Sequence, residues 1–73
     1  MKISKYTSLF RNFRGFNYQR DFTDEAGFNL DIADDIAGNQ EICWAYLFRA
    51  DTGRPILKYR RGMTEPLQIP EDK

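Results

Sequence analysis

Histidine is absent from this sequence, and its absence excludes many catalytic and metal-binding sites. Ser–His and Cys–His nucleophile pairs cannot form within one chain, and neither can the common zinc sites with imidazole ligands. Carboxylate or lysine chemistry stays open in principle, but no usable catalytic set is visible. We therefore expect a protein that is not an enzyme and that needs no cofactor and no metal.

Cysteine and long apolar runs are also scarce. The one cysteine, Cys43, cannot form an internal disulfide, so nothing indicates an oxidising compartment. No apolar run approaches the ~20 residues of a membrane span, and residues 1–10 lack the hydrophobic centre of a signal peptide. These absences predict a cytoplasmic protein without membrane contact.

The chain has 73 residues, which predicts a single small domain over residues 1–73, near the lower size limit for a stable core. Aromatic residues make up 15% of the sequence, and each buries about 150–250 Å² when it packs. Ordering the chain costs roughly 1.5 kcal/mol per residue, so little net stability remains. Size alone therefore favours association with a partner or with a second copy of the chain.

Charges of opposite sign occupy separate blocks, although the net charge is zero. Residues 1–20 contain five basic residues and no acidic one, whereas residues 21–41 contain seven acidic residues and no basic one. Residues 42–61 are basic again, with five basic residues against Asp51. Such blocks let the acidic segment dock between the basic ones, or produce a surface with two poles.

The stretch from residue 42 to residue 61 predicts a β-hairpin around which the chain folds. Its first half alternates with period two: Ile42, Trp44, Tyr46 and Phe48 share one face, and Cys43, Ala45 and Leu47 share the other. Both faces are apolar, which predicts a central strand with both faces buried and Trp44 in the core. Asp51, Gly53 and Pro55 favour a reversal, and residues 56–61 return as a more polar strand.

Two shorter elements are expected before the acidic block. Residues 4–13 predict a short helix, because Tyr6, Phe10 and Phe13 recur at helical spacing and Gly15 suits the position past its end. From Phe16 to Phe22 the aromatic residues alternate instead, which predicts a half-exposed strand.

Residues 23–38 admit two interpretations. The favoured one is a helix over about residues 24–37, with Thr23 as N-cap and Gly38 as stop. Its apolar stripe is Ala26, Leu30, Ala33 and Ala37, widened by Ile32 and Ile36. The opposite side carries Asp24, Asp31, Asp34 and Asp35. Gly27 and Asn29 are poor helix formers, and residues 26–32 also alternate, so a strand followed by a loop stays open.

The expected fold is α+β: a small antiparallel sheet of about three strands, one helix, and an extended tail over residues 63–73. The tail is expected to be extended because Pro66 and Pro70 bracket it. An all-β meander is the alternative, and it applies if residues 23–38 form a strand.

Two charged surfaces are predicted to bind another protein. The acidic one is Asp31, Asp34 and Asp35, whose spacing does not match a calcium-binding loop. The basic one is Lys58, Arg60 and Arg61, although such residues also protect edge strands from mispairing.

A second hypothesis is an aromatic and arginine surface for single-stranded nucleic acid. Its residues are Phe13, Arg14, Phe16, Tyr18 and Arg20. The neighbouring acidic block and the sequence pI of 6.2 argue against it, because affinity for phosphate comes from uncompensated cations. The favoured expectation is a small non-catalytic protein-binding module, of the kind that inhibits or adapts larger bacterial or phage-targeted machines, with homo-oligomerisation open.

Overall fold

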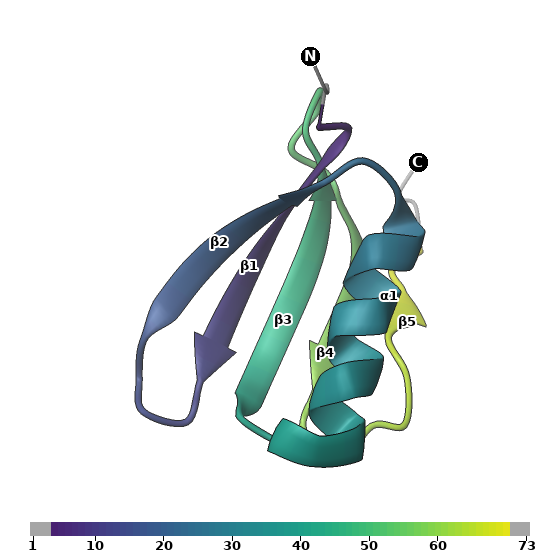
Figure 1. Ribbon diagram of the computed structural model, residues 1–73. Coiled ribbons are helices and arrows are strands. Elements are labelled where there is room, and N and C mark those ends of the chain that lie inside the picture. The colour runs from purple at the N-terminus through teal and green to yellow at the C-terminus, as the bar shows by residue number, and fades with distance from the viewer. Residues whose placement is uncertain (1–3, 71–73) are drawn as a thin grey trace.

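The computed structural model describes residues 4–70, apart from the side chain of Asn39, and has an α+β fold (Figure 1). Five strands form one antiparallel sheet in the order β2-β1-β3-β4-β5. The strands are β1 (Tyr6–Asn12), β2 (Asn17–Phe22), β3 (Ile42–Arg49), β4 (Pro55–Arg60) and β5 (Leu67–Gln68). Between β2 and β3, the helix α1 (Glu25–Asp34) continues into a π-helical turn, η1 (Asp35–Asn39).

The sheet has two more strands than the sequence predicts. The predicted helix over residues 4–13 is wrong, because this segment contains β1, and the predicted extended tail contains β5. Pairing with β2 on one side and β3 on the other satisfies the backbone of β1, which outweighs the weak helical tendency of ten residues. Residues 71–73 of the predicted tail lie outside the described residues.

The error over β1 comes from the spacing of Tyr6, Phe10 and Phe13, which also fits a helix. Ser8 and Phe10 point into the core as strand residues, whereas Phe13 lies beyond the end of the strand. Ser8 Oγ donates a hydrogen bond of 2.8 Å to the carbonyl oxygen of Arg20 on β2, so its buried hydroxyl is satisfied. The predicted strand over residues 16–22 is confirmed as β2.

The predicted helix over residues 23–38 is confirmed, but its two ends differ from the expectation. Asp24 rather than Thr23 is the N-cap, because its Oδ1 atom accepts a 3.0 Å hydrogen bond from the backbone N–H of Gly27. The helical backbone passes Gly38 and ends at Gln40, whose φ of 50° is left-handed. No helix within residues 4–70 is long and apolar enough to cross a lipid bilayer.

The buried face of α1 carries Phe28 and Ile32, four residues apart and both fully buried. The predicted stripe is confirmed only at its widened edge, where Ile32 is buried and Ile36 is half-buried. Its other four members are exposed: Ala26, Leu30, Ala33 and Ala37. The Phe28 ring lies 5.7 Å from that of Phe10 and 6.1 Å from that of Phe22. An aromatic ring buries more apolar area than alanine side chains, so Phe28 sets the rotation of the helix.

The core lies between α1 and one face of the sheet. Its buried hydrophobic residues are Phe10, Phe28, Ile32, Ile42, Ala45, Leu47, Leu57 and Tyr59. The predicted hairpin is confirmed as β3 and β4, but the prediction that both faces of β3 are buried is wrong. Ala45 and Leu47 lie under the helix, whereas Trp44 points to the other face and is not part of the core.

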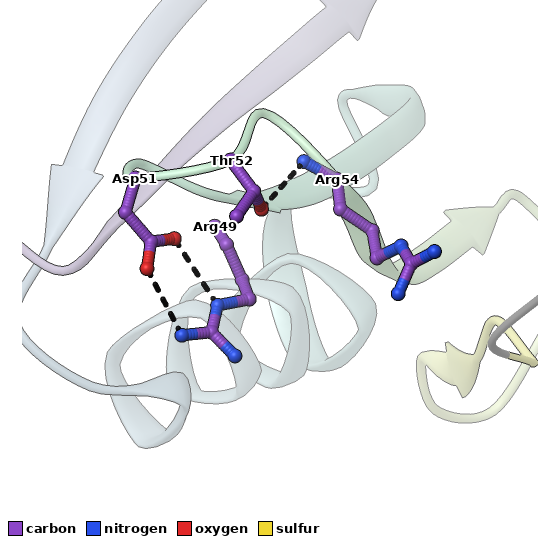
Figure 2. A network of polar contacts seen from close by, with 4 residues as sticks. All are labelled: Arg49, Asp51, Thr52 and Arg54. Carbon is purple, nitrogen blue, oxygen red and sulfur yellow. Dashed lines mark hydrogen bonds and ion pairs between the residues drawn. The ribbon is translucent and has the colours of Figure 1, made fainter.

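The turn between β3 and β4 is held by polar contacts among its own residues (Figure 2). Arg49 donates two hydrogen bonds to Asp51, from Nε to Oδ1 at 3.2 Å and from Nη2 to Oδ2 at 3.1 Å. Hydrogen bonding to this guanidinium lowers the pKa of the Asp51 carboxyl. The backbone N–H of Arg54 donates to Thr52 Oγ1 at 3.3 Å, and Gly53 takes a φ of +71°, which favours glycine. These contacts fix how β4 returns along β3.

Candidate functional site

One face of the sheet, which we call the open face, points away from α1 and carries no helix or strand of residues 4–70 (Figure 1). Its side chains alternate along each strand with those that face the core. They are Thr7, Leu9 and Arg11; Asn17, Gln19 and Asp21; Trp44, Tyr46 and Phe48; Lys58 and Arg60; and Leu67. The three aromatic residues follow one another along β3, at the middle of the sheet.

Cross-strand pairing places Trp44 between two arginines. Trp44 on β3 is opposite Arg11 of β1 and opposite Arg60 of β4. The next outward residue of β3, Tyr46, is opposite Lys58 of β4. Residues directly opposite in antiparallel strands have Cβ atoms about 4.5–5.5 Å apart, so they are neighbours on the face. The aromatic row therefore has a cation beside each of its first two members.

The three rings of this row touch one another at an angle. The Trp44 and Tyr46 centroids are 5.5 Å apart with planes inclined by 61°, and those of Tyr46 and Phe48 are 6.2 Å apart with planes inclined by 38°. Each side chain is half-buried by its neighbours. The row thus presents ring surface in more than one direction, which suits a ligand made of separately oriented planar groups.

The cations of the open face are available to a ligand. Arg11, Lys58 and Arg60 are exposed, and none of them forms an ion pair within the described part of the chain. Arg11 makes one long contact, 3.5 Å from Nη1 to Asn17 Oδ1, which is at the limit for a hydrogen bond. The acid on this face is Asp21, on the edge strand β2, so the centre of the face is positively charged.

Asp35, predicted to belong to an exposed acidic surface, is instead a structural residue. It is 5% exposed. Its carboxylate accepts hydrogen bonds from the backbone N–H groups of Glu41 at 2.8 Å and of Ile42 at 3.2 and 3.3 Å. Asp35 therefore fixes the connection between η1 and β3, and its carboxylate is not exposed as the sequence predicts.

The other two aspartates also differ from each other. Asp31 Oδ2 lies 2.9 Å from Nη1 of Arg20 on β2. This oxygen is closed to solvent and accepts no aligned hydrogen bond, so the contact is mainly electrostatic. Asp34 is exposed, with no ion pair among residues 4–70. Asp31, Asp34 and Asp35 thus line one pocket together with Arg20, but the carboxylates of Asp31 and Asp35 are already engaged, so the three do not form the exposed acidic surface that the sequence predicts.

The predicted basic surface is divided as well. Lys58 and Arg60 lie on the open face, but Arg61 does not. Arg61 donates from Nη1 to the Gln40 carbonyl oxygen at 3.0 Å and from Nη2 to Gln40 Oε1 at 3.3 Å, and its Cζ lies 4.6 Å from the centroid of the Phe13 ring. Arg61 therefore joins the end of β4 to the end of η1 and to the β1–β2 turn.

Two residues of the predicted nucleic-acid surface, Tyr18 and Arg20, lie on the helix side of β2. The Tyr18 ring stacks on Phe10 with centroids 5.0 Å apart and planes inclined by 3°. Burial raises the pKa of Tyr18, and the negative charge of Asp35 raises it further. Since Arg20 is paired with Asp31 on the same side, neither residue contributes to the open face.

The other three residues of that predicted surface lie in the turn between β1 and β2. Phe13 is 53% exposed and Phe16 is 66% exposed. Asn12 Oδ1 accepts hydrogen bonds of 3.0 Å from the backbone N–H groups of Arg14 and Phe16, which orders the turn. The five predicted residues are therefore split between a turn and the helix side of β2, and they do not form one platform.

Sequence reasoning missed the open face because it assigned the aromatic row of β3 to the core. A usable signal was the difference in side-chain size between the two faces of the strand. Cys43 and Ala45 are small, which allows a helix to approach, whereas Trp44, Tyr46 and Phe48 are all large. One short helix covers one face of a sheet, so the face with the larger rings stays uncovered.

Comparisons with protein-family models, with curated proteins and with solved structures found no match to this chain. The functional interpretation therefore depends on the geometry and chemistry of the open face.

Proposed function

We propose that this protein is a small non-catalytic binding module and that the open face is its contact surface. The observation that carries the proposal is the row of Trp44, Tyr46 and Phe48 on the open face, beside cations that form no ion pair with other described residues. An antiparallel sheet that faces water on one side normally places polar residues there. Contiguous aromatic surface on that side is typical of an interaction site.

The proposed contact surface is therefore the open face of the sheet, and no longer the acidic residues of the helical segment. Of the three aspartates first expected to bind a partner, Asp35 accepts hydrogen bonds from backbone N–H groups, and Asp31 forms an ion pair with Arg20. Lys58 and Arg60 keep the role expected of them, but together with Arg11 instead of Arg61.

Support for a non-catalytic role comes from the residue types present. The chain has no histidine, and residues 4–70 contain no group of three acidic or cysteine side chains placed to hold a metal ion. Cys43, the one thiol, is half-buried next to the irregular end of β3, where a cysteine acts as a small hydrophobe. Binding therefore explains the exposed chemistry better than catalysis does.

Site-specific photo-crosslinking tests this function, because it captures whichever molecule contacts the labelled position. A benzophenone amino acid would replace Tyr46 on the open face, or Leu67 on β5 as a second position on the same face. The control position is Leu30, which is 64% exposed on the outer side of α1. We expect crosslinks to cellular material from positions 46 and 67 but not from position 30. Equal crosslinking from position 30, or none from the open face in folded protein, would contradict the proposal.

A further inference from the structure

We propose that the partner of the open face is a single-stranded nucleic acid, whose bases stack on the aromatic row while its phosphates meet the flanking cations. This inference rests on the function proposed above and adds the chemical class of the partner. The residues that carry it are Trp44, Tyr46 and Phe48 for the bases, and Arg11, Lys58 and Arg60 for the phosphates.

The aromatic row fits bases that rotate independently. Successive outward residues of a strand are about 6.6–6.8 Å apart along its axis, so the row offers a repeated stacking surface along an extended ligand. The planes of Trp44 and Tyr46 differ by 61°, and a single strand can follow such a change because its bases are not held in a common stack. In a duplex the bases are stacked on one another and closed to such rings.

The cations fit the backbone of the same ligand. Arg11 and Arg60 lie on opposite sides of Trp44, and Lys58 lies beside Tyr46. A base on either ring therefore has a cation within reach of its phosphate. Single-strand binding proteins combine these two features, a positive track for the backbone and aromatic side chains for the bases.

Most of the acidic block does not oppose this arrangement, because it lies on the helix side of the sheet, and its member on the open face, Asp21, is on the edge strand β2. Asp31 is paired with Arg20, and the buried carboxylate of Asp35 binds backbone N–H groups. Asp34 is exposed, but it belongs to α1, which packs on the opposite side of the sheet from a ligand on the open face. Exposed charges further apart than about 8 Å are largely screened at physiological salt.

A second copy of the chain fits the open face less well than a polyanion does. Two open faces in contact would bring Arg11, Lys58 and Arg60 of one copy against the same positive surface of the other. Among the strand residues of this face that the structure describes, Asp21 at the edge is the one acid that could balance them. Charge complementarity therefore favours an anionic partner.

Fluorescence anisotropy of a labelled single strand of about 12 nucleotides tests the inference. We expect a dissociation constant of about 1–100 µM, the range of binding without sequence preference. With three phosphate contacts, raising the salt from about 50 mM to about 200 mM should weaken binding roughly 20-fold. Replacing Arg11 and Arg60 together by glutamine should reduce this loss to roughly 3-fold.

Two further variants separate the open face from the rest of the surface. Phe48→Ala should weaken binding by at least about 5-fold, because a stacking ring is lost. Arg14→Gln is the control, since it removes one exposed arginine from the β1–β2 turn whose side chain makes no hydrogen bond or ion pair with residues 4–70. It should change the affinity less than about 2-fold, and circular dichroism would confirm that each variant is folded.

The results distinguish this inference from the function on which it rests. Absence of binding up to about 100 µM protein at low salt would overturn the nucleic-acid partner, and so would equal losses in Phe48→Ala and Arg14→Gln. If position 46 then still crosslinks specifically to a protein, the open face remains the contact surface and only the partner class is wrong. If position 46 also fails to crosslink, the proposed function fails as well.

Discussion

The carboxylate of Asp35 and the backbone N–H of Ile42 join the end of the helical segment to the first residue of β3. The two oxygen atoms lie 3.3 and 3.2 Å from the Ile42 nitrogen, and one of them also accepts from Glu41 at 2.8 Å. A buried backbone N–H needs such a partner. This contact positions the strand that carries Trp44 and the rest of the aromatic row.

Replacing Asp35 by alanine should therefore destabilise the fold strongly. The variant leaves two backbone N–H groups without their charged acceptor, which we expect to cost about 3 kcal/mol in the free energy of unfolding. Asp34→Ala is the matched control, because its carboxylate is exposed, and it should change stability by less than about 0.5 kcal/mol. Urea unfolding of both variants measures the difference. Equal losses of unfolding free energy in the two variants would refute the structural role of the Asp35 carboxylate.

Gly27→Ala should destabilise the protein, although alanine is the better helix former by about 1 kcal/mol. A Cβ atom at position 27 would lie 2.7 Å from Cδ1 of Phe22, whose ring packs against Phe28. Gly38→Ala is the control, because a Cβ atom there meets nothing within 4 Å. Thermal melts should give a lower midpoint for Gly27→Ala and an unchanged or higher one for Gly38→Ala. A stabilised Gly27→Ala variant would mean that Phe22 moves aside without cost.

Trp44→Ala should be tolerated better than Leu47→Ala, despite the greater size of tryptophan. Leu47 is fully buried under the helix, so its truncation leaves a cavity and should cost about 2–5 kcal/mol. Trp44 is half-buried on the open face, where solvent can fill the space, and we expect a loss of about 1–2 kcal/mol. Chemical denaturation of both variants provides the comparison. The reverse order would place Trp44 in the core after all.

Tyr59 should make the fold sensitive to alkaline pH. Burial raises the pKa of Tyr59, and the charge of Asp35 adds to this rise, so the folded protein keeps the phenol neutral longer than the unfolded chain does. The resulting stability is fully present below the unfolded pKa of about 10 and is lost as the pH rises through the folded pKa. Between about pH 8 and about pH 11, Tyr59→Phe should lose less unfolding free energy than the parent protein. Identical losses of unfolding free energy in the two proteins would show that the pKa of Tyr59 is not raised in the folded protein.

The elements that the sequence predicts correctly are those with local signals. The β3–β4 hairpin has alternating residues on both sides of Gly53 and Pro55, and the helix has an acidic start at Asp24. The prediction for β1 is wrong because its conformation depends on the two strands that pair with it: β2, which follows after a short turn, and β3, which comes after the helix. Pairing on both sides outweighs the helical spacing of Tyr6 and Phe10.

The candidate site was harder to predict than the fold, because it depends on which face of β3 the helix covers. The sequence makes both faces of that strand apolar, so Trp44 looks like a core residue until α1 is placed. The rotation of α1, set by Phe28, also decides that Asp35 is buried while Asp34 is exposed. Arg11 becomes a neighbour of Trp44 only through the pairing of β1 with β3, which local patterns do not contain.

The fluorescence of Trp44 gives the most direct test of the open face as a nucleic-acid surface, because the chain contains one tryptophan. A single strand of about 12 nucleotides would be titrated into the protein at about 50 mM salt while the emission of Trp44 is recorded. We predict that the emission is quenched in a saturable way as bases stack on the ring, and that about 200 mM salt largely reverses the quenching. Unchanged Trp44 emission, under conditions where the anisotropy of the labelled strand reports binding, would place the ligand elsewhere and contradict this role of the open face.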